Sequence, residues 1–101
     1  MEISKGDKVK FKSEVQQYTV RAANDRYIIC TKPFNAINGY LYSIIDLKEK
    51  IRAPHDRMFN CYGYDDKDFR AMLIHIMRGT INLSHRRRIA LDIERITLLN
   101  F

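Results

Sequence analysis

Residues 65–79 read DDKDFRAMLIHIMRG and carry the clearest helix signal in this 101-residue chain. Asp65 or Asp66 can cap the start of the helix, and the acidic first turn suits the positive end of the helix dipole. Gly79 is typical of a residue that ends a helix, and Arg78 suits the negative end. Helical spacing predicts one apolar face packed on the core: Phe69, Met72, Leu73, Ile76 and Met77.

Short β-like segments precede this helix. Apolar residues alternate with lysines over residues 8–13, which predicts a half-buried strand, and the alternation continues at Tyr18, Val20 and Ala22. Asn24-Asp25 predicts a turn into a third strand, which Pro33 is expected to end because proline lacks a backbone donor. The segments of the predicted antiparallel meander are residues 8–13, 18–22, 27–31, 40–47 after the turn Asn38-Gly39, and 51–53.

The segments on either side of the helix complete the predicted fold. Residues 55–64 are expected to form a loop, and residues 91–99 a C-terminal strand that is bulged near Arg95 or buried on both faces. Strands, a helix and a returning strand indicate the α+β class. We expect a small curled antiparallel sheet, or an SH3-like partial barrel, packed against one amphipathic helix in a single domain over residues 1–101.

Composition limits the possible functions. The formal net charge of +6 favours a nucleic acid, a nucleotide or an acidic protein as the partner. No segment approaches the roughly 18 consecutive apolar residues of a membrane span, and the start of the chain lacks a signal-peptide pattern. We therefore expect an intracellular protein without a membrane partner.

Catalysis has little support in the residue pattern. The three histidines and two cysteines show no metal-ligand spacing, so no metal or cofactor is expected. Cys61 with His55 or His85 is a conceivable nucleophile pair, but no third residue is evident to orient the base. The sequence favours a protein that is not an enzyme.

The strongest functional signal is the run Ser84-His85-Arg86-Arg87-Arg88 after the helix. No acidic residue lies between positions 68 and 92, so the positive field is not neutralised locally. Guanidinium groups match phosphate oxygens in pairs, which makes phosphate the expected ligand. In an extended segment Arg86 and Arg88 share a face, and Arg87 points elsewhere or reaches a neighbouring protomer. If that face opens on solvent instead, the run is only a charged edge.

Two Phe-Asn pairs supply the other half of a nucleotide site. Phe34-Asn35 and Phe59-Asn60 each place a stacking ring beside an amide that can read an adenine edge. The alternative is that both phenylalanines fill the ends of the core. His85 can donate to a phosphate when protonated, or it can make an ordinary structural hydrogen bond.

Several segments together resemble a family of small bacteriophage proteins. The distinctive ones are ICTKPFN at residues 29–35 and the SHRxR pattern at residues 84–88, and weaker matches extend the likeness over about residues 25–93. The pattern is similar to that of the first-described type of Thoeris anti-defence proteins. These are phage-made sponges that capture immune signals derived from cyclic ADP-ribose without cleaving them.

This resemblance implies a non-enzymatic homo-oligomer with pockets between protomers, acting in the host cytoplasm. The ligand is then a cyclic nucleotide of the glycocyclic ADP-ribose type, and some relatives also hold small cyclic oligonucleotides. Arg86 and Arg88 take a phosphate-holding role, and Phe34 or Phe59 contacts a base. Arg87 stands where the family often has Asn, which leaves the identity of the ligand open. The expected ligand-binding set is Arg26, Phe34, Asn35, Arg57, Phe59, Asn60, His85, Arg86, Arg87 and Arg88.

Two other functions compete with this one. The first is a small basic nucleic-acid-binding or nuclease-inhibiting phage module, in which Lys8, Lys10 and Lys12 track a phosphate backbone together with the arginine run. The second is a phage structural or regulatory protein whose basic face meets an acidic partner. Neither of them requires a cofactor.

Overall fold

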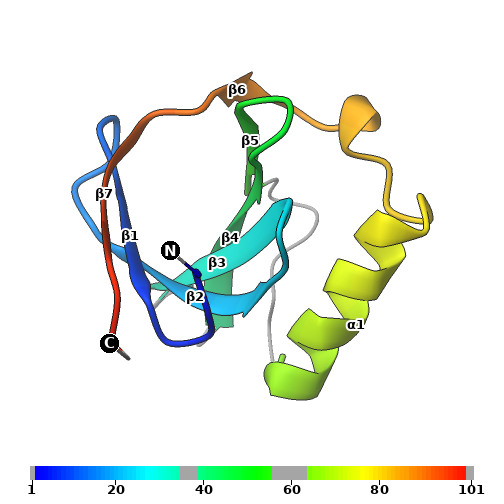
Figure 1. The fold of residues 1–101 in the computed structure, drawn as a ribbon, viewed down its shortest axis with the longest axis horizontal. Coiled ribbons are helices and arrows are strands. Elements are labelled where there is room, and N and C mark those ends of the chain that lie inside the picture. Colours follow the sequence, from blue (N-terminus) through cyan, green and yellow to red (C-terminus); the bar gives the residue numbers. More distant parts are fainter. Residues whose placement is uncertain (1, 35–38, 56–63, 100–101) are drawn as a thin grey trace.

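A curled antiparallel sheet with one helix packed on it makes up the part of the chain that the computed structural model describes, residues 2–34, 39–55 and 64–99 (Figure 1). Its seven strands follow the spatial order β6-β5-β4-β3-β2-β1-β7 and bend into a half-barrel. The predicted α+β class and the curled sheet on one helix are thus confirmed. The elements are β1 Lys8–Phe11, β2 Tyr18–Ala23, β3 Tyr27–Phe34, β4 Gly39–Asp46, β5 Ile51–Pro54, α1 Asp66–Met77, the 3-10 helix η2 Leu83–His85, β6 Ile89–Ala90 and β7 Ile93–Thr97.

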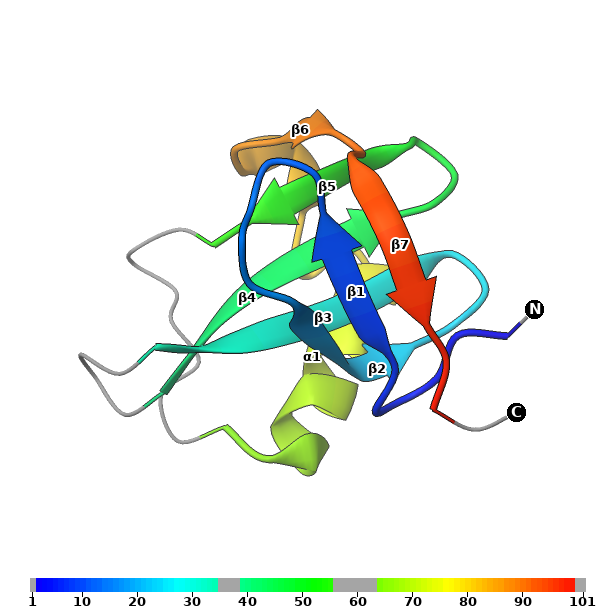
Figure 2. The same ribbon diagram turned by 90° about the vertical axis from the view of Figure 1, so that its left-hand side faces the viewer.

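The two edge strands of the sheet are consecutive along the chain. Strands β1 to β5 form the predicted meander, each pairing with the next. The chain then pairs with β5 as β6 and, after only Leu91 and Asp92, with β1 as β7. Figure 2 shows β6 leading directly into β7 across one end of the half-barrel. Main-chain hydrogen bonds from Lys12 N to Asp92 O (2.8 Å) and from Leu91 N to Lys50 O (3.0 Å) hold this link in place.

Apolar side chains form two layers, one on each face of the sheet. The inner cluster lies inside the curl of the sheet and consists of Val9, Phe11, Tyr18, Val20, Ile28, Cys30 and Ile45. The helix-face cluster lies between the sheet and α1 and consists of Ala22, Ile29, Tyr42, Ile44, Ala53, Phe69 and Ile76. Each face of the central strands is therefore covered, as their apolar runs require.

A bulge in β2 decides which layer its side chains enter. The register between β2 and β3 shifts between Val20 and Ala22. Val20 packs in the inner cluster, whereas Ala22 packs in the helix-face cluster. Burial alternates along β2 as expected, with Tyr18, Val20 and Ala22 buried, but Ala22 faces the opposite layer because the bulge adds one residue to the strand. A second register shift lies between Lys10 and Phe11 of β1, opposite β7.

Strand β3 continues past Pro33, which was expected to end it. Pro33 lies opposite Tyr40 of β4, and the strand runs on to Phe34. On its other side, the pairing between β3 and β2 ends at Thr31 opposite Thr19. Pro33 therefore occupies an edge-like position with one hydrogen-bonded neighbour, where a missing backbone donor costs little.

The helix begins and ends as its sequence predicts. Asp65 is the N-cap, and its Oδ1 accepts a hydrogen bond from Asp68 N (3.1 Å), while Asp65 N donates to Asp68 Oδ2 (2.9 Å). Gly79 follows the helix with a φ of +78°, which favours glycine. The expected packed face is confirmed for Phe69, Met72, Leu73 and Ile76. The prediction that Met77 belongs to this face is wrong, because Met77 is 60% exposed. At 3.6 residues per turn Met77 lies about 80° around the helix from Phe69, which takes it off the sheet.

Candidate functional site

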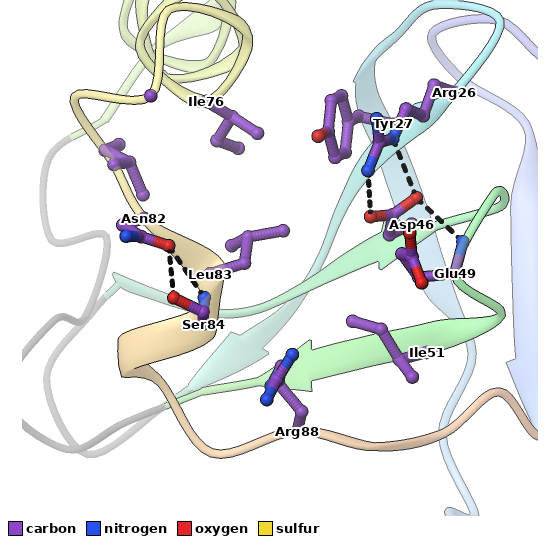
Figure 3. A pocket seen from close by; sticks show the side chains of 12 residues that line it. Arg26, Tyr27, Asp46, Glu49, Ile51, Ile76, Asn82, Leu83, Ser84 and Arg88 are labelled. Atoms are coloured by element: carbon purple, nitrogen blue, oxygen red, sulfur yellow. Dashed lines mark hydrogen bonds and ion pairs between the residues drawn. The ribbon is translucent and has the colours of Figure 1, made fainter.

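A cavity of about 340 Å³ lies between the sheet and the C-terminal end of α1, and we call it the α1 cavity (Figure 3). Its apolar wall combines sheet residues with residues of α1 and the segment that follows it. Its polar groups come from the β2–β3 turn, the β4–β5 turn, η2 and the arginine run. The lining residues are Arg26, Tyr27, Asp46, Glu49, Ile51, Ile76, Gly79, Ile81, Asn82, Leu83, Ser84 and Arg88.

Arg26 is held in place by a carboxylate. The Asp46 side chain accepts from Arg26 Nε (3.0 Å) and Nη2 (2.9 Å), and the guanidinium carbon lies 4.8 Å from the Tyr27 ring centroid. Asp46 Oδ1 also accepts from the main-chain N–H groups of Lys48 and Glu49. Burial raises the pKa of Asp46, but the hydrogen bonds from Arg26 and from this turn lower it below its usual range. Asp46 thus stays ionised and neutralises the charge of Arg26.

Arg88 is the cation that the α1 cavity leaves without a carboxylate. No acidic side chain of the described residues forms an ion pair with it, and Figure 3 shows its guanidinium below η2, on the side of the cavity away from Arg26. The nearby η2 is capped by Asn82, whose Oδ1 accepts from Ser84 N (3.0 Å) and Ser84 Oγ (2.6 Å). This cap fixes the backbone just before the arginine run.

The other two arginines of the run lie outside the α1 cavity. Arg86 donates to Tyr42 Oη, and its guanidinium carbon lies 5.7 Å from the centroid of that buried ring in the helix-face cluster. Arg87 lines a different cavity of about 330 Å³ on the inner side of the sheet, together with Lys32 and Arg52. Arg86 and Arg88 therefore share a side of the sheet while Arg87 takes the other, but Arg86 and Arg88 do not line one cavity.

Two further predicted site residues that the structure describes, His85 and Phe34, do not line the α1 cavity. His85 is exposed on η2 and does not line this cavity, and Phe34 is 36% exposed at the end of β3. The other predicted contacts lie outside the described residues: Asn35, Arg57, Phe59 and Asn60. Cys61, the conceivable nucleophile, also lies outside them.

Sequence reasoning missed the acidic side of the α1 cavity. Asp46 and Glu49 lie about 40 residues before Arg88, and residues 48–50 read as an ordinary solvated turn. Asp46 carries one usable signal, because it is an acid at the end of the most apolar strand, and a buried acid requires partners. Nothing in the sequence singles out Glu49.

A second polar centre, which we call the closing network, joins β5 to the β6–β7 link. Arg52 is 1% exposed, with its guanidinium carbon 3.9 Å from the Phe11 ring centroid. It donates to Asp92 Oδ1 (2.7 Å) and to Glu14 Oε2 (2.9 Å). Ser13 supplies further hydrogen bonds to Asp92 through its N and Oγ. The network therefore ties the segment after β1, strand β5 and the edge link together.

Protonation of Asp92 is expected to weaken the fold in acid. Burial raises its pKa, but hydrogen bonds from Arg52 and Ser13 lower the pKa to about 2. Because the folded value lies below the ordinary value of 3.8, the ionised carboxylate contributes stability above about pH 4, and this contribution is lost as the pH falls through 2. We expect a loss of about 2 kcal/mol in the free energy of unfolding over this window, measured by urea denaturation.

Two variants test this assignment. Asp92→Asn should be less stable than the wild type at pH 7 and should have a flatter pH dependence between pH 4 and 2. Asp25→Asn is the control, because it removes an exposed acid on the β2–β3 turn, outside the closing network. An Asp92→Asn protein with the full wild-type slope would contradict the role given to Asp92.

The fold and the α1 cavity define a small α+β half-barrel protein with a mixed-charge cavity beside its helix. No protein-family model, curated protein or solved structure matches the chain in the comparisons. Among the described residues, no helix is long and apolar enough to cross a membrane. The same part of the chain holds no group of three or more His, Cys, Asp or Glu side chains placed to bind a metal ion.

Proposed function

We propose that this protein is a non-enzymatic phage anti-defence protein that sequesters cyclic nucleotide immune signals in the host cytoplasm. The expected ligand is of the glycocyclic ADP-ribose type, with small cyclic oligonucleotides as further ligands. The observation that carries the proposal is Arg88, a cation without a described carboxylate partner that faces a cavity of about 340 Å³ with an apolar wall. Cavities of this size are typical of small-molecule sites. The resemblance in residues 29–35 and 84–88 supports the same ligand class.

The groups around the α1 cavity suit binding without cleavage. Ser84 Oγ bonds to the amide oxygen of Asn82, which is not a base that can activate a hydroxyl. Asp46 is engaged by Arg26 and by its own turn. Away from this cavity, Cys30 is buried in the inner cluster, and burial raises the pKa of its thiol far above the neutral range, so it is a poor nucleophile. The groups around the cavity can therefore bind a charged ligand, but none of those that the structure describes is an activated nucleophile.

The proposed function also involves a particular barrel type and a particular assembly. We describe the half-barrel as SH3-like, with β7 as its C-terminal strand, and we expect a homo-oligomer with ligand pockets between protomers. In such an assembly Arg87, on the inner side of the sheet, is available to a neighbouring copy or to its ligand. Mass in solution with and without nucleotide measures the assembly directly.

A nucleic-acid-binding module is less well supported. Lys8 Nζ donates to Thr19 Oγ1 (2.6 Å), and Lys10 Nζ donates to Phe11 O (2.7 Å) and lies 3.6 Å from Glu94 Oε2. Two of the three lysines expected to track a phosphate backbone are thus engaged within the protein. Binding to a nucleic acid would weaken steeply with added salt, whereas a ligand enclosed in a cavity is less sensitive.

Calorimetry with glycocyclic ADP-ribose tests the proposed function. The wild type should bind, and Arg88→Ala should weaken binding about tenfold to hundredfold without loss of folded stability, because it removes a charge-assisted hydrogen bond to phosphate. Arg70→Ala is the matched control, since Arg70 is an exposed arginine on α1 that does not line the α1 cavity.

Recovery of the ligand after denaturing the complex distinguishes capture from catalysis. Intact ligand supports sequestration, and a cleaved product would place the protein among the enzymes. Absence of binding at micromolar protein would overturn the proposed function.

A further inference from the structure

Glu49 forms the acidic side of the α1 cavity. It lies in the β4–β5 turn, where its main-chain N–H donates to Asp46 Oδ1 (3.2 Å) and so fixes the turn against Arg26. Among the described residues, no lysine or arginine forms an ion pair with the Glu49 carboxylate. In Figure 3, Ile51 lies between Glu49 and Arg88. The cavity thus has the exposed Glu49 carboxylate on one side of Ile51 and the exposed Arg88 guanidinium on the other. Glu49 acts on Arg26 electrostatically, but within the described part of the chain neither Glu49 nor Arg88 forms an ion pair.

The charges of the α1 cavity therefore divide into two kinds. Arg26 and Asp46 form a bidentate ion pair and neutralise each other. Arg88 and Glu49 remain, one positive and one negative. A ligand that is anionic over its whole surface would be repelled at Glu49. The cavity instead fits a ligand with a phosphate at one end and uncharged hydrogen-bond donors at the other.

Neighbouring hydroxyl groups on a sugar are the donors that best fit a carboxylate. An ionised carboxylate only accepts hydrogen bonds, and its two oxygens can take the two hydroxyls of a ribose together. Acidic side chains recognise ribose hydroxyls in this way in dinucleotide-binding folds. The apolar wall of Ile76, Ile81 and Leu83 offers a surface for a base.

We propose that Glu49 is a specificity residue that recognises the ribose hydroxyls of a ribonucleotide unit whose phosphate is bound by Arg88. This inference rests on the proposed function and adds to it the sugar that the site selects. It also assigns Arg26 and Asp46 as positioning residues, because they hold the turn that carries Glu49.

Calorimetry with AMP and 2′-deoxy-AMP on the wild type, Glu49→Gln and Glu94→Gln tests the inference. The wild type should bind AMP about tenfold to hundredfold more tightly than 2′-deoxy-AMP, because a hydrogen bond to a charged group is lost with the hydroxyl. Glu49→Gln should weaken AMP binding and remove most of this preference. Glu94→Gln is the matched control, since Glu94 is an exposed acid on β7 that does not line the cavity.

The direction in which Glu49→Gln changes the affinity shows whether Glu49 recognises the ribose or is only a nearby anion. If Glu49 is only a nearby anion, Glu49→Gln removes repulsion and tightens the binding of every phosphate ligand, which would overturn the inference. Equal affinity of the wild type for the two nucleotides would also overturn it.

Glycocyclic ADP-ribose serves as the second probe for the same variants, and it decides the question if AMP alone binds too weakly to measure. Weaker binding to Glu49→Gln supports the inference, whereas unchanged or tighter binding overturns it and leaves the proposed function standing. If neither AMP nor glycocyclic ADP-ribose binds the wild type, both proposals fail.

Discussion

Replacing Arg52 with methionine is expected to lower the free energy of unfolding by about 3–5 kcal/mol. The side chain is 1% exposed, and its removal takes an ion pair from each of Glu14 and Asp92. Glu14 keeps its ion pair with Lys32 (2.7 Å), so the uncompensated charge is mainly that of Asp92. Methionine keeps apolar bulk against Phe11, so the loss reports the charge rather than a cavity. Chemical denaturation followed by circular dichroism measures the change.

Two further variants make this prediction specific to the closing network. Arg95→Met breaks an exposed ion pair with Glu94 and should cost less than about 1 kcal/mol. Adding Asp92→Asn to Arg52→Met should recover part of the lost stability, because it removes the main uncompensated charge. An Arg52→Met protein as stable as Arg95→Met would show that the network contributes little to the fold.

Replacing Phe69 with alanine is expected to cost a similar amount, about 3–5 kcal/mol. Phe69 is fully buried and makes edge contacts with Tyr40 and Tyr64, with ring centroids 6.3 and 5.7 Å away. The guanidinium carbon of Arg21 lies 4.5 Å from its ring centroid. The substitution removes the anchor of α1 and leaves a cavity in the helix-face cluster, so it should also weaken ligand binding, because Ile76 of α1 lines the site.

Met77→Ala is the control for this second prediction, because it shortens an apolar side chain on the same helix that is 60% exposed. Its cost should stay within about 0.5 kcal/mol, as for most surface substitutions. Unfolding measured by tyrosine fluorescence and by helix signal in circular dichroism compares the two. Equal losses in the two variants would mean that Phe69 is not the anchor of α1.

The parts of the fold set by local chemistry could be predicted from the sequence. The cap at Asp65, the glycine after the helix and the spacing of Phe69 and Ile76 act within a few residues, and the structure agrees with each. The prediction failed where the conformation or the packing of a residue depends on a neighbour that is distant in the sequence. Pro33 stays in its strand because of where the β2–β3 pairing ends, and Ala22 changes face because of a bulge.

The candidate site was predicted only in part for the same reason. The density of arginine pointed to the run that contains Arg88, and alternation grouped Arg86 with Arg88 and separated Arg87 from them. The engagement of Arg86 with Tyr42 depends on a residue 44 positions away, which no local pattern reveals. Arg26 lines the cavity, and its expected contact with the ligand stays a prediction. Its partner Asp46 lies 20 positions later and neutralises a charge that the sequence counts as available.

The pairing of β1 with β7 also constrains how the chain can acquire its structure during synthesis. Lys8 pairs with Thr97 and Val9 with Ile96, so β1 is synthesised well before its partner strand β7. Before the C-terminal segment leaves the ribosome, one side of β1 lacks its ladder and the inner cluster is open. Over the same interval, Arg52 lacks its ion pair with Asp92. The nascent meander must therefore remain competent for closure until translation of this part of the chain is complete.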